Sequence, residues 1–141
     1  MEFLVSRNAK LIVLILEAII LAGLFFGFYL IRYKKNRAAH EKNQTFWVLF
    51  NLVPILFVMA VNFSNMARAN FMPPLIVGHV ISGIVAELLG IYIILRMKNM
   101  LPQNLRVKNF KRLMQITLAL WTLQALGGFY IYYTLYICGC P

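Results

Sequence analysis

The composition of the chain is that of a membrane protein. It has 141 residues, of which 62% are hydrophobic and only 13% are charged. A soluble domain usually contains about 45–50% apolar and about 25% charged residues, so too little charge is present here to solvate a soluble surface. We therefore expect a single integral membrane domain over residues 1–141.

The charge of the chain is strongly positive. Its formal net charge is +10, from 14 Lys and Arg residues against 4 acidic residues. A nucleic-acid-binding protein carries its cations on one face of a soluble fold, whereas here they lie in polar segments between apolar runs. We expect these segments to contact anionic lipid headgroups and not nucleic acid.

Four apolar runs are long enough to cross a membrane as helices. A helix rises about 1.5 Å per residue, so about 20 residues cross a hydrocarbon core of about 30 Å. The runs cover residues 11–31, 46–63, 75–95 and 113–137. The first contains Glu17 and the third contains Glu87, while Pro54 predicts a kink in the second.

The connections between these runs are short and cover residues 32–45, 64–74 and 96–112. Short connections make consecutive helices antiparallel neighbours. Pro73 and Pro74 favour the end of one helix and the start of the next. The sequence therefore predicts an all-α fold, a four-helix transmembrane bundle with up-down-up-down topology.

The cations are divided unequally between the two sides of this bundle. Eleven lie in or beside the first and third connections, at Arg32, Lys34, Lys35, Arg37, Lys42, Arg96, Lys98, Arg106, Lys108, Lys111 and Arg112. The other side has Arg7, Lys10 and Arg68. Because segments rich in Lys and Arg stay in the cytoplasm, both termini are expected outside, in a multi-pass protein of a prokaryotic plasma membrane.

Five polar side chains are predicted inside the bilayer, where burial is costly. Counting from the outer helix ends places Glu17 and His79 in one layer, with Glu87 deeper and level with Asn51 and Gln124. They are either a proton-linked or metal-linked site, or polar contacts between helices or with another subunit. Neither carboxyl has an intramembrane Lys or Arg to pair with, so each is expected to be protonated and hydrogen-bonded.

Small residues recur at four-residue spacing on two of the predicted helices. They are Gly23 and Gly27 on the first, and Gly78, Ser82, Ala86 and Gly90 on the third. Such stripes allow a neighbouring helix to approach closely. We interpret them as packing features without a chemical role.

A second candidate site gathers ligands for soft metal ions on the outer side. These residues are Met66, Met72, His79, Cys138 and Cys140. Thiolate and thioether ligands favour Cu(I), so copper is the metal predicted here. For the cysteines, a disulfide, a contact with another subunit or a disordered tail are the alternatives. Haem is disfavoured, because the two histidines, His40 and His79, are predicted on opposite sides of the membrane.

The chain resembles a family of small four-helix membrane proteins that includes the CtaM-like oxidase maturation factors. The matching residues are Gly27–Arg32 with His40, then His79, Tyr92, Leu95 and Arg96, and finally Lys111–Met114, Thr117, Trp121, Gly127, Gly128, Tyr132 and Tyr133. The chain departs from the family pattern where Gln44 follows His40 and where Phe110 precedes the last helix. The resemblance implies a helper in assembling a haem–copper oxidase, or a relative used as a subunit.

No catalytic motif occurs in the sequence, so the chain is not expected to be an enzyme on its own. The predicted function is that of a non-catalytic accessory subunit or assembly factor of a membrane oxidase or copper monooxygenase, with other membrane subunits as partners. A membrane electron carrier with a single haem and a small proton-linked transporter are the alternatives. The transporter hypothesis assigns the coupling to Glu17 and Glu87.

Overall fold

The computed structural model describes residues 7–68 and 73–138, and within these ranges it is entirely helical apart from its connections. The α-helices are α1 (Arg7–Arg32), α2 (Arg37–Pro54), α3 (Ala60–Arg68), α4 (Pro74–Met97) and α5 (Phe110–Tyr132). Two π-helices, Ile55–Met59 and Tyr133–Cys138, and a 3-10 turn, Gln103–Leu105, complete the described elements. Because α2, the first π-helix and α3 follow without a break, they form one continuous rod, which we call the α2–α3 rod.

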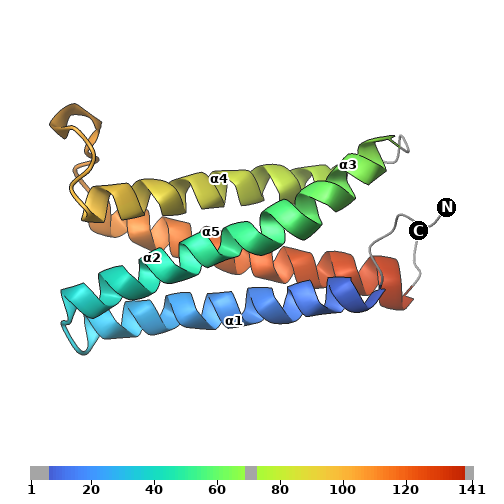
Figure 1. Cartoon of the computed structure of the whole chain (residues 1–141), viewed down its shortest axis with the longest axis horizontal. Coiled ribbons are helices and arrows are strands. Elements are labelled where there is room, and N and C mark those ends of the chain that lie inside the picture. Colours follow the sequence, from blue (N-terminus) through green and yellow to red (C-terminus); the bar gives the residue numbers. More distant parts are fainter. Residues whose placement is uncertain (1–6, 69–72, 139–141) are drawn as a thin grey trace.

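The α2–α3 rod lies beside α1 and α4 in an antiparallel bundle, and α5 completes the bundle by packing against α1 and α4 (Figure 1). The α1–α2 turn and the α4–α5 loop lie at one end, which we call the basic end because the eleven cations lie in or near these connections. The end where α1 begins and α5 ends is called the terminal end. The predicted all-α fold with four helical rods in up-down-up-down order is confirmed for the described residues.

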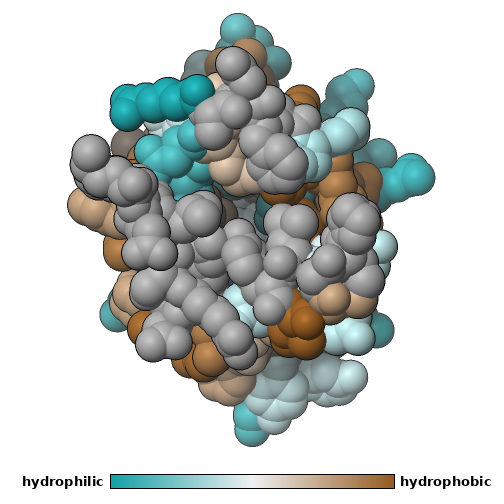
Figure 2. Space-filling model, turned by 90° about the vertical axis from the view of Figure 1, so that its right-hand side faces the viewer, coloured by the Kyte–Doolittle hydropathy of each residue, from teal (hydrophilic) through white to brown (hydrophobic). Residues whose placement is uncertain are grey.

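Three segments are long and apolar enough to cross a membrane: Leu11–Arg32, Arg37–Arg68 and Pro74–Met97. Their exposed apolar side chains, such as Phe57 and Leu88, face outwards, and the end-on view shows hydrophobic residues on several sides of the bundle (Figure 2). Helix α5 is not among these segments, because glutamine, threonine and tyrosine side chains lower its mean hydropathy.

The second helix begins earlier than the sequence predicts. Residues 32–45 were expected to form a connection, but the helix begins at Arg37, leaving a turn of residues 33–36. Asn36 caps the helix, since its side chain accepts a hydrogen bond of 3.0 Å from the backbone N–H of Ala39. The polar side chains among residues 37–45, which suggested a loop, instead form contacts with α1.

Polar side chains at the start of α2 bind the backbone of α1. His40 bonds the carbonyl of Gly27 at 2.7 Å, Asn43 that of Gly23 at 2.7 Å, and Gln44 that of Leu24 at 3.1 Å. The glycines permit this approach, because a Cβ atom at Gly23 would lie 2.1 Å from Cε2 of Trp47. The small-residue pair therefore has the packing role predicted for it.

The rod changes its helical geometry at Pro54. Proline has no N–H to continue the α-helical pattern, and the next five residues, Ile55–Met59, form a π-helix. Beyond this point the rod makes only sparse contacts with the other three helices. The predicted kink therefore takes the form of a widened turn, after which α3 separates from the tightly packed part of the bundle.

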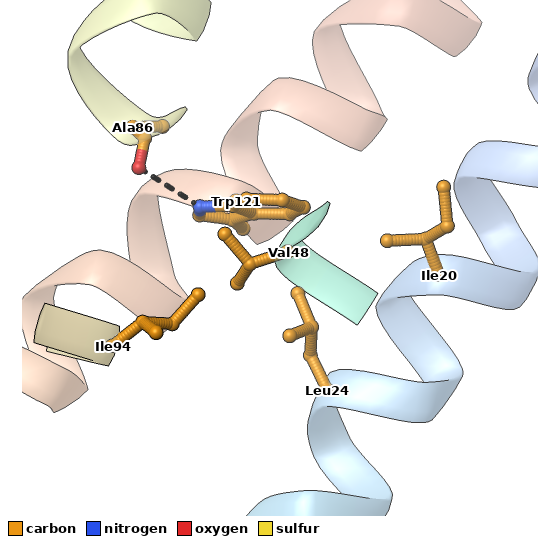
Figure 3. Packing of buried hydrophobic residues seen from close by; sticks show 6 residues of the cluster. All are labelled: Ile20, Leu24, Val48, Ala86, Ile94 and Trp121. Carbon is orange, nitrogen blue, oxygen red and sulfur yellow. Dashed lines mark hydrogen bonds between the residues drawn. The ribbon is translucent and has the colours of Figure 1, made fainter. Parts of the chain in front are cut away.

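The tightly packed core lies on the basic side of this turn. It consists of Ile20, Leu24, Val48, Ala86, Ile94 and Trp121. Figure 3 shows the indole of Trp121 beside Val48, with its Nε1 donating a hydrogen bond of 3.1 Å to the carbonyl of Ala86. Of the small-residue stripe on α4, Ala86 and Gly90 face this core, since a Cβ atom at Gly90 would lie 3.1 Å from Val48 and 3.6 Å from Trp121, whereas a Cβ atom at Gly78 would meet nothing within 4 Å.

Candidate binding cavity

A cavity of about 580 Å³ lies between the rods, on the terminal side of the core, and it is open on one side, where the exposed residues Ile84 and Leu88 line it. Val13 of α1, Met66 of α3 and Ile76 of α4 line it near the terminal end. On α4 the lining continues past Glu87 to Ile91, which lies fifteen residues beyond Ile76, or about 22 Å along the helix axis. Trp121 of the core also lines it, so the core closes the cavity towards the basic end.

The deepest polar contact of the cavity joins Asn51 of α2 to Glu87 of α4. The Asn51 Nδ2 donates a hydrogen bond of 3.0 Å to Glu87 Oε2. Each of the two side chains is only 6% exposed. The contact expected between Glu87 and Asn51 is therefore present, across the two helices that approach each other just before the widened turn.

This pair retains two buried oxygens without a partner. Within the described part of the chain, neither Asn51 Oδ1 nor Glu87 Oε1 makes a hydrogen bond. An unpaired polar atom in an apolar interior costs about 1–3 kcal/mol. Both residues line the cavity, so a group placed in the cavity beside them is what could supply the missing contacts.

A second carboxyl, Glu17 of α1, lines the same cavity and is half-buried. It faces this cavity from α1, while Glu87 faces it from α4. Among the described residues that line the cavity there is no Lys or Arg. The cavity therefore combines mostly apolar walls with two acidic groups and no fixed positive charge.

Gln124 of α5, which the sequence places at the depth of Glu87, forms its hydrogen bonds with other residues of α4. Its Nε2 donates a hydrogen bond of 2.8 Å to the backbone carbonyl of His79, and its Oε1 accepts one of 3.0 Å from Ser82. Gly83 makes room for this amide, because a Cβ atom there would lie 2.3 Å from Gln124 Nε2. Gln124 thus joins α4 to α5 and does not contact Glu87 through a hydrogen bond.

His79 lines the cavity together with Glu17. Its ring packs against α5, since a Cβ atom at Gly127 would lie 3.1 Å from His79 Nδ1. No direct hydrogen bond joins His79 to Glu17 within the described residues, so contact between them through a bridging water stays a prediction.

Three of the five candidate copper ligands lie within the described residues. Met66 and His79 both line the cavity, Cys138 is disulfide-bonded, and Met72 and Cys140 lie outside the described residues. No group of three His, Cys, Asp or Glu residues in the described ranges could hold a metal ion. Copper binding stays a prediction, and a disulfide sulfur is not the thiolate on which that prediction relied.

His40 is the residue whose environment the sequence analysis missed. It was assigned to a cytoplasmic loop, but it is buried between α2 and α1, with only 8% of its surface exposed. The ring nitrogen that contacts the Gly27 carbonyl, Nδ1, is the protonated one, because a carbonyl can only accept. The spacing of His40, Asn43, Gln44 and Trp47 at three and four residues was the available signal, since it marks one face of a helix.

Comparison with known proteins adds no relationship to this geometry. No family model, no curated protein and no solved structure matches the chain.

Proposed function

We propose that the chain is a four-span integral membrane protein that binds a small, largely apolar molecule in its central cavity without catalysing a reaction, as a binding protein or a carrier. Three spans meet the length and hydropathy requirement, and α5 is proposed as the fourth. It runs along α1 and α4, with which it shares most of its contacts.

Four side chains of α5 that carry polar groups do not oppose a place in the membrane, because their hydrogen bonds are made inside the bundle. Gln124 bonds α4, while Thr117 and Thr122 each donate a bond of 2.9 Å to a carbonyl of the preceding turn. Trp121 donates to Ala86. A hydropathy scale counts these side chains as exposed polar groups, although within the bundle their hydrogen-bonding needs are met.

The proposed orientation places the basic end in the cytoplasm and in contact with anionic lipid headgroups. The cavity then opens towards the outer half of the membrane. The one ion pair in the described residues is that of Lys98 with Glu41, at 3.7 Å, so the other cations at the basic end have no neighbouring carboxylate to compensate their charge. Two of them make other contacts, since Arg106 donates to the Leu101 carbonyl at 2.9 Å and Arg96 lies over the Phe110 ring.

The cavity is the observation that carries the proposed function. Small-molecule sites are typically 300–1,000 Å³ clefts with mostly apolar walls and a few well-placed polar groups. A volume of about 580 Å³, with Asn51, Glu87 and Glu17 as convergent polar groups, fits that description.

A neutral cage compound, adamantyl alcohol, tests this function. We expect saturable binding of the labelled alcohol to the protein in lipid nanodiscs, beyond that of empty nanodiscs. Val80 lines the cavity, so Val80→Phe is expected to weaken binding at least about tenfold by filling it, a loss of about 1.4 kcal/mol. The neighbouring Ile81 is 58% exposed and is not among the residues that line the cavity, so Ile81→Phe is the matched control and is expected to bind normally.

The result that would overturn the proposal is the absence of saturable binding by the wild-type protein, both for the alcohol and for the corresponding amine. Equal losses in the two phenylalanine variants would place the bound molecule on the lipid-facing surface and would also contradict it.

A second candidate function is that of an accessory subunit or assembly factor of a membrane oxidase or copper monooxygenase. The observation that favours it is the sparse packing of residues 55–68 against the rest of the bundle. On this segment Phe57 is 74% exposed and Leu56 58%. A partner's transmembrane helix packed there would complete the bundle on its open side.

The two candidates differ in what accompanies the protein after mild solubilisation. An accessory subunit is expected to migrate on a native gel with defined membrane subunits that mass spectrometry identifies, and Phe57→Ala is expected to release them. A lone monomer with nothing in stoichiometric association contradicts the permanent-subunit hypothesis and leaves the binding function as the single candidate.

A further inference from the structure

We propose that the Asn51–Glu87 pair, assisted by Glu17, binds the ammonium group of a lipophilic amine whose apolar body occupies the cavity. This inference rests on the proposed binding function and names the chemical class of its ligand. It is carried by the two buried, partnerless oxygens of the pair and by the absence of cationic residues among the described cavity walls.

The first step concerns hydrogen bonding. With Asn51 Nδ2 directed at Glu87 Oε2, the two remaining oxygens, Asn51 Oδ1 and an ionised Glu87 Oε1, can only accept. A primary ammonium group carries three donors and no acceptor. It can therefore satisfy both oxygens together, whereas a hydroxyl has a single donor.

The second step concerns charge. Glu17 and Glu87 line the same space, which has mostly apolar walls, and two uncompensated negative charges would be strongly unfavourable there. A bound water molecule would meet the hydrogen-bonding need but would not compensate charge. An ammonium group does both, and its hydrogen bonds to a carboxylate are of the stronger, charge-assisted kind.

The third step concerns competition with protons, since a proton on a carboxyl also removes its charge. The ionisable groups facing the cavity are Glu17 from α1, His79 and Glu87 from α4, and Tyr132 from α5, while the α2–α3 rod contributes only uncharged side chains among the described residues. Protons and the amine compete for the same carboxyls, so the affinity for the amine is expected to fall as the pH falls.

The fourth step concerns the rest of the ligand. Glu87 lies at the closed side of the cavity, beside Trp121 and Ala86 of the core. Towards the terminal end the lining is mainly apolar and includes Val13, Ile55 and Val80. A ligand with its ammonium group at the pair therefore places an apolar body between the rods, towards the half of the bundle where the α2–α3 rod has separated.

Three cage compounds of nearly the same shape separate charge from hydrogen bonding. Adamantylamine has charge and N–H donors, trimethyladamantylammonium has charge alone, and adamantyl alcohol has one donor and no charge. Binding to the wild-type protein in nanodiscs of neutral lipid is expected to weaken in that order. The amine should bind about tenfold to a hundredfold more tightly than the alcohol, as one charge-assisted hydrogen bond allows.

Two isosteric variants assign the selectivity to the cavity. Glu87→Gln is expected to lose the tenfold or greater preference for the amine while keeping the affinity for the alcohol within about twofold, since it preserves shape but removes the charge. The control is Glu41→Gln at the basic end, where Glu41 pairs with Lys98 outside the cavity. It is expected to leave all three affinities unchanged.

The outcomes separate this inference from the function on which it rests. Equal binding of amine and alcohol by the wild-type protein overturns the amine inference, assigns the unpaired oxygens to water and leaves the binding function intact. Parallel loss of both ligands in Glu87→Gln also overturns it, because the residue would then only support the fold. If that variant does not fold, the order of the three ligands in the wild-type protein decides. Binding of none of them contradicts the function itself.

Discussion

The contact between α1 and α2 offers the sharpest test of how this bundle is held together. In Gly23→Ala the new Cβ atom would lie 2.1 Å from Cε2 and 2.2 Å from Nε1 of Trp47. The indole must move, and this movement disrupts the hydrogen bond of 3.2 Å that Trp47 Nε1 donates to Asn43 Oδ1. Asn43 in turn bonds the Gly23 carbonyl, so one methyl group disturbs two hydrogen bonds and a ring.

The expected cost follows from these contacts. Overpacking costs about 1–3 kcal/mol, and hydrogen bonds between helices in a membrane protein average about 0.6 kcal/mol each. Replacing glycine by alanine within a helix by itself stabilises the folded state by about 0.5–1 kcal/mol. We therefore expect Gly23→Ala to lower the free energy of unfolding by about 2 kcal/mol, the net of these terms.

The assay is unfolding in mixed micelles with increasing SDS, followed by far-UV circular dichroism. Gly78→Ala is the matched control, because a Cβ atom at Gly78 meets nothing within 4 Å, and it is expected to be neutral or slightly stabilising. If the two variants unfold at the same SDS fraction, the close approach of α1 and α2 is not what stabilises this part of the bundle, and the reasoning is refuted.

Three further predictions concern the core, the α4–α5 loop and the orientation. Trp121→Phe removes the hydrogen bond to Ala86 and is expected to lower the free energy of unfolding in the same assay by about 1–2 kcal/mol; no loss would contradict the contact. Tyr92→Phe removes the bonds of the hydroxyl to the Leu105 carbonyl, at 2.6 Å, and from the Val107 N–H, at 3.1 Å. It should speed hydrogen exchange at Val107 about tenfold while leaving global unfolding unchanged. In a Cys138→Ser, Cys140→Ser background, Arg68→Cys should react with an impermeant thiol reagent from outside and Asn99→Cys should not, whereas the reverse pattern would invert the proposed topology.

The number and direction of the helices could be read from the sequence, because both depend on local properties. Long apolar runs and short connections determine them, and the cations cluster where the chain turns. The pairing of Glu87 with Asn51 could be predicted for a similar reason, since counting the rise per residue places both at one depth. These properties are set along single helices and need no knowledge of the detailed packing.

The start of α2 and the cavity could not be predicted in that way. His40 and Asn43 look like loop residues to a hydropathy scale, since their partners are backbone carbonyls of α1. The cavity depends on how far the rod separates after Pro54, where a π-helix occurs. A proline indicates that the hydrogen-bonding pattern will change, but not whether a neighbouring helix will follow and fill the space.

The hydrogen bonds also help to decide which polar residues act as structural contacts and which as a site. The amides of Asn43, Gln44 and Gln124 each bond a backbone carbonyl of a neighbouring helix, which is how polar residues hold membrane helices together. Glu87 is different, because within the described residues its hydrogen-bond partner is Asn51 and each of the pair keeps a buried oxygen unpaired. His40 Nε2, Thr45 Oγ1 and Arg96 Nε are also buried without a partner in this part of the chain. What sets the Asn51–Glu87 pair apart is that both residues line the cavity, where the proposed ligand would lie.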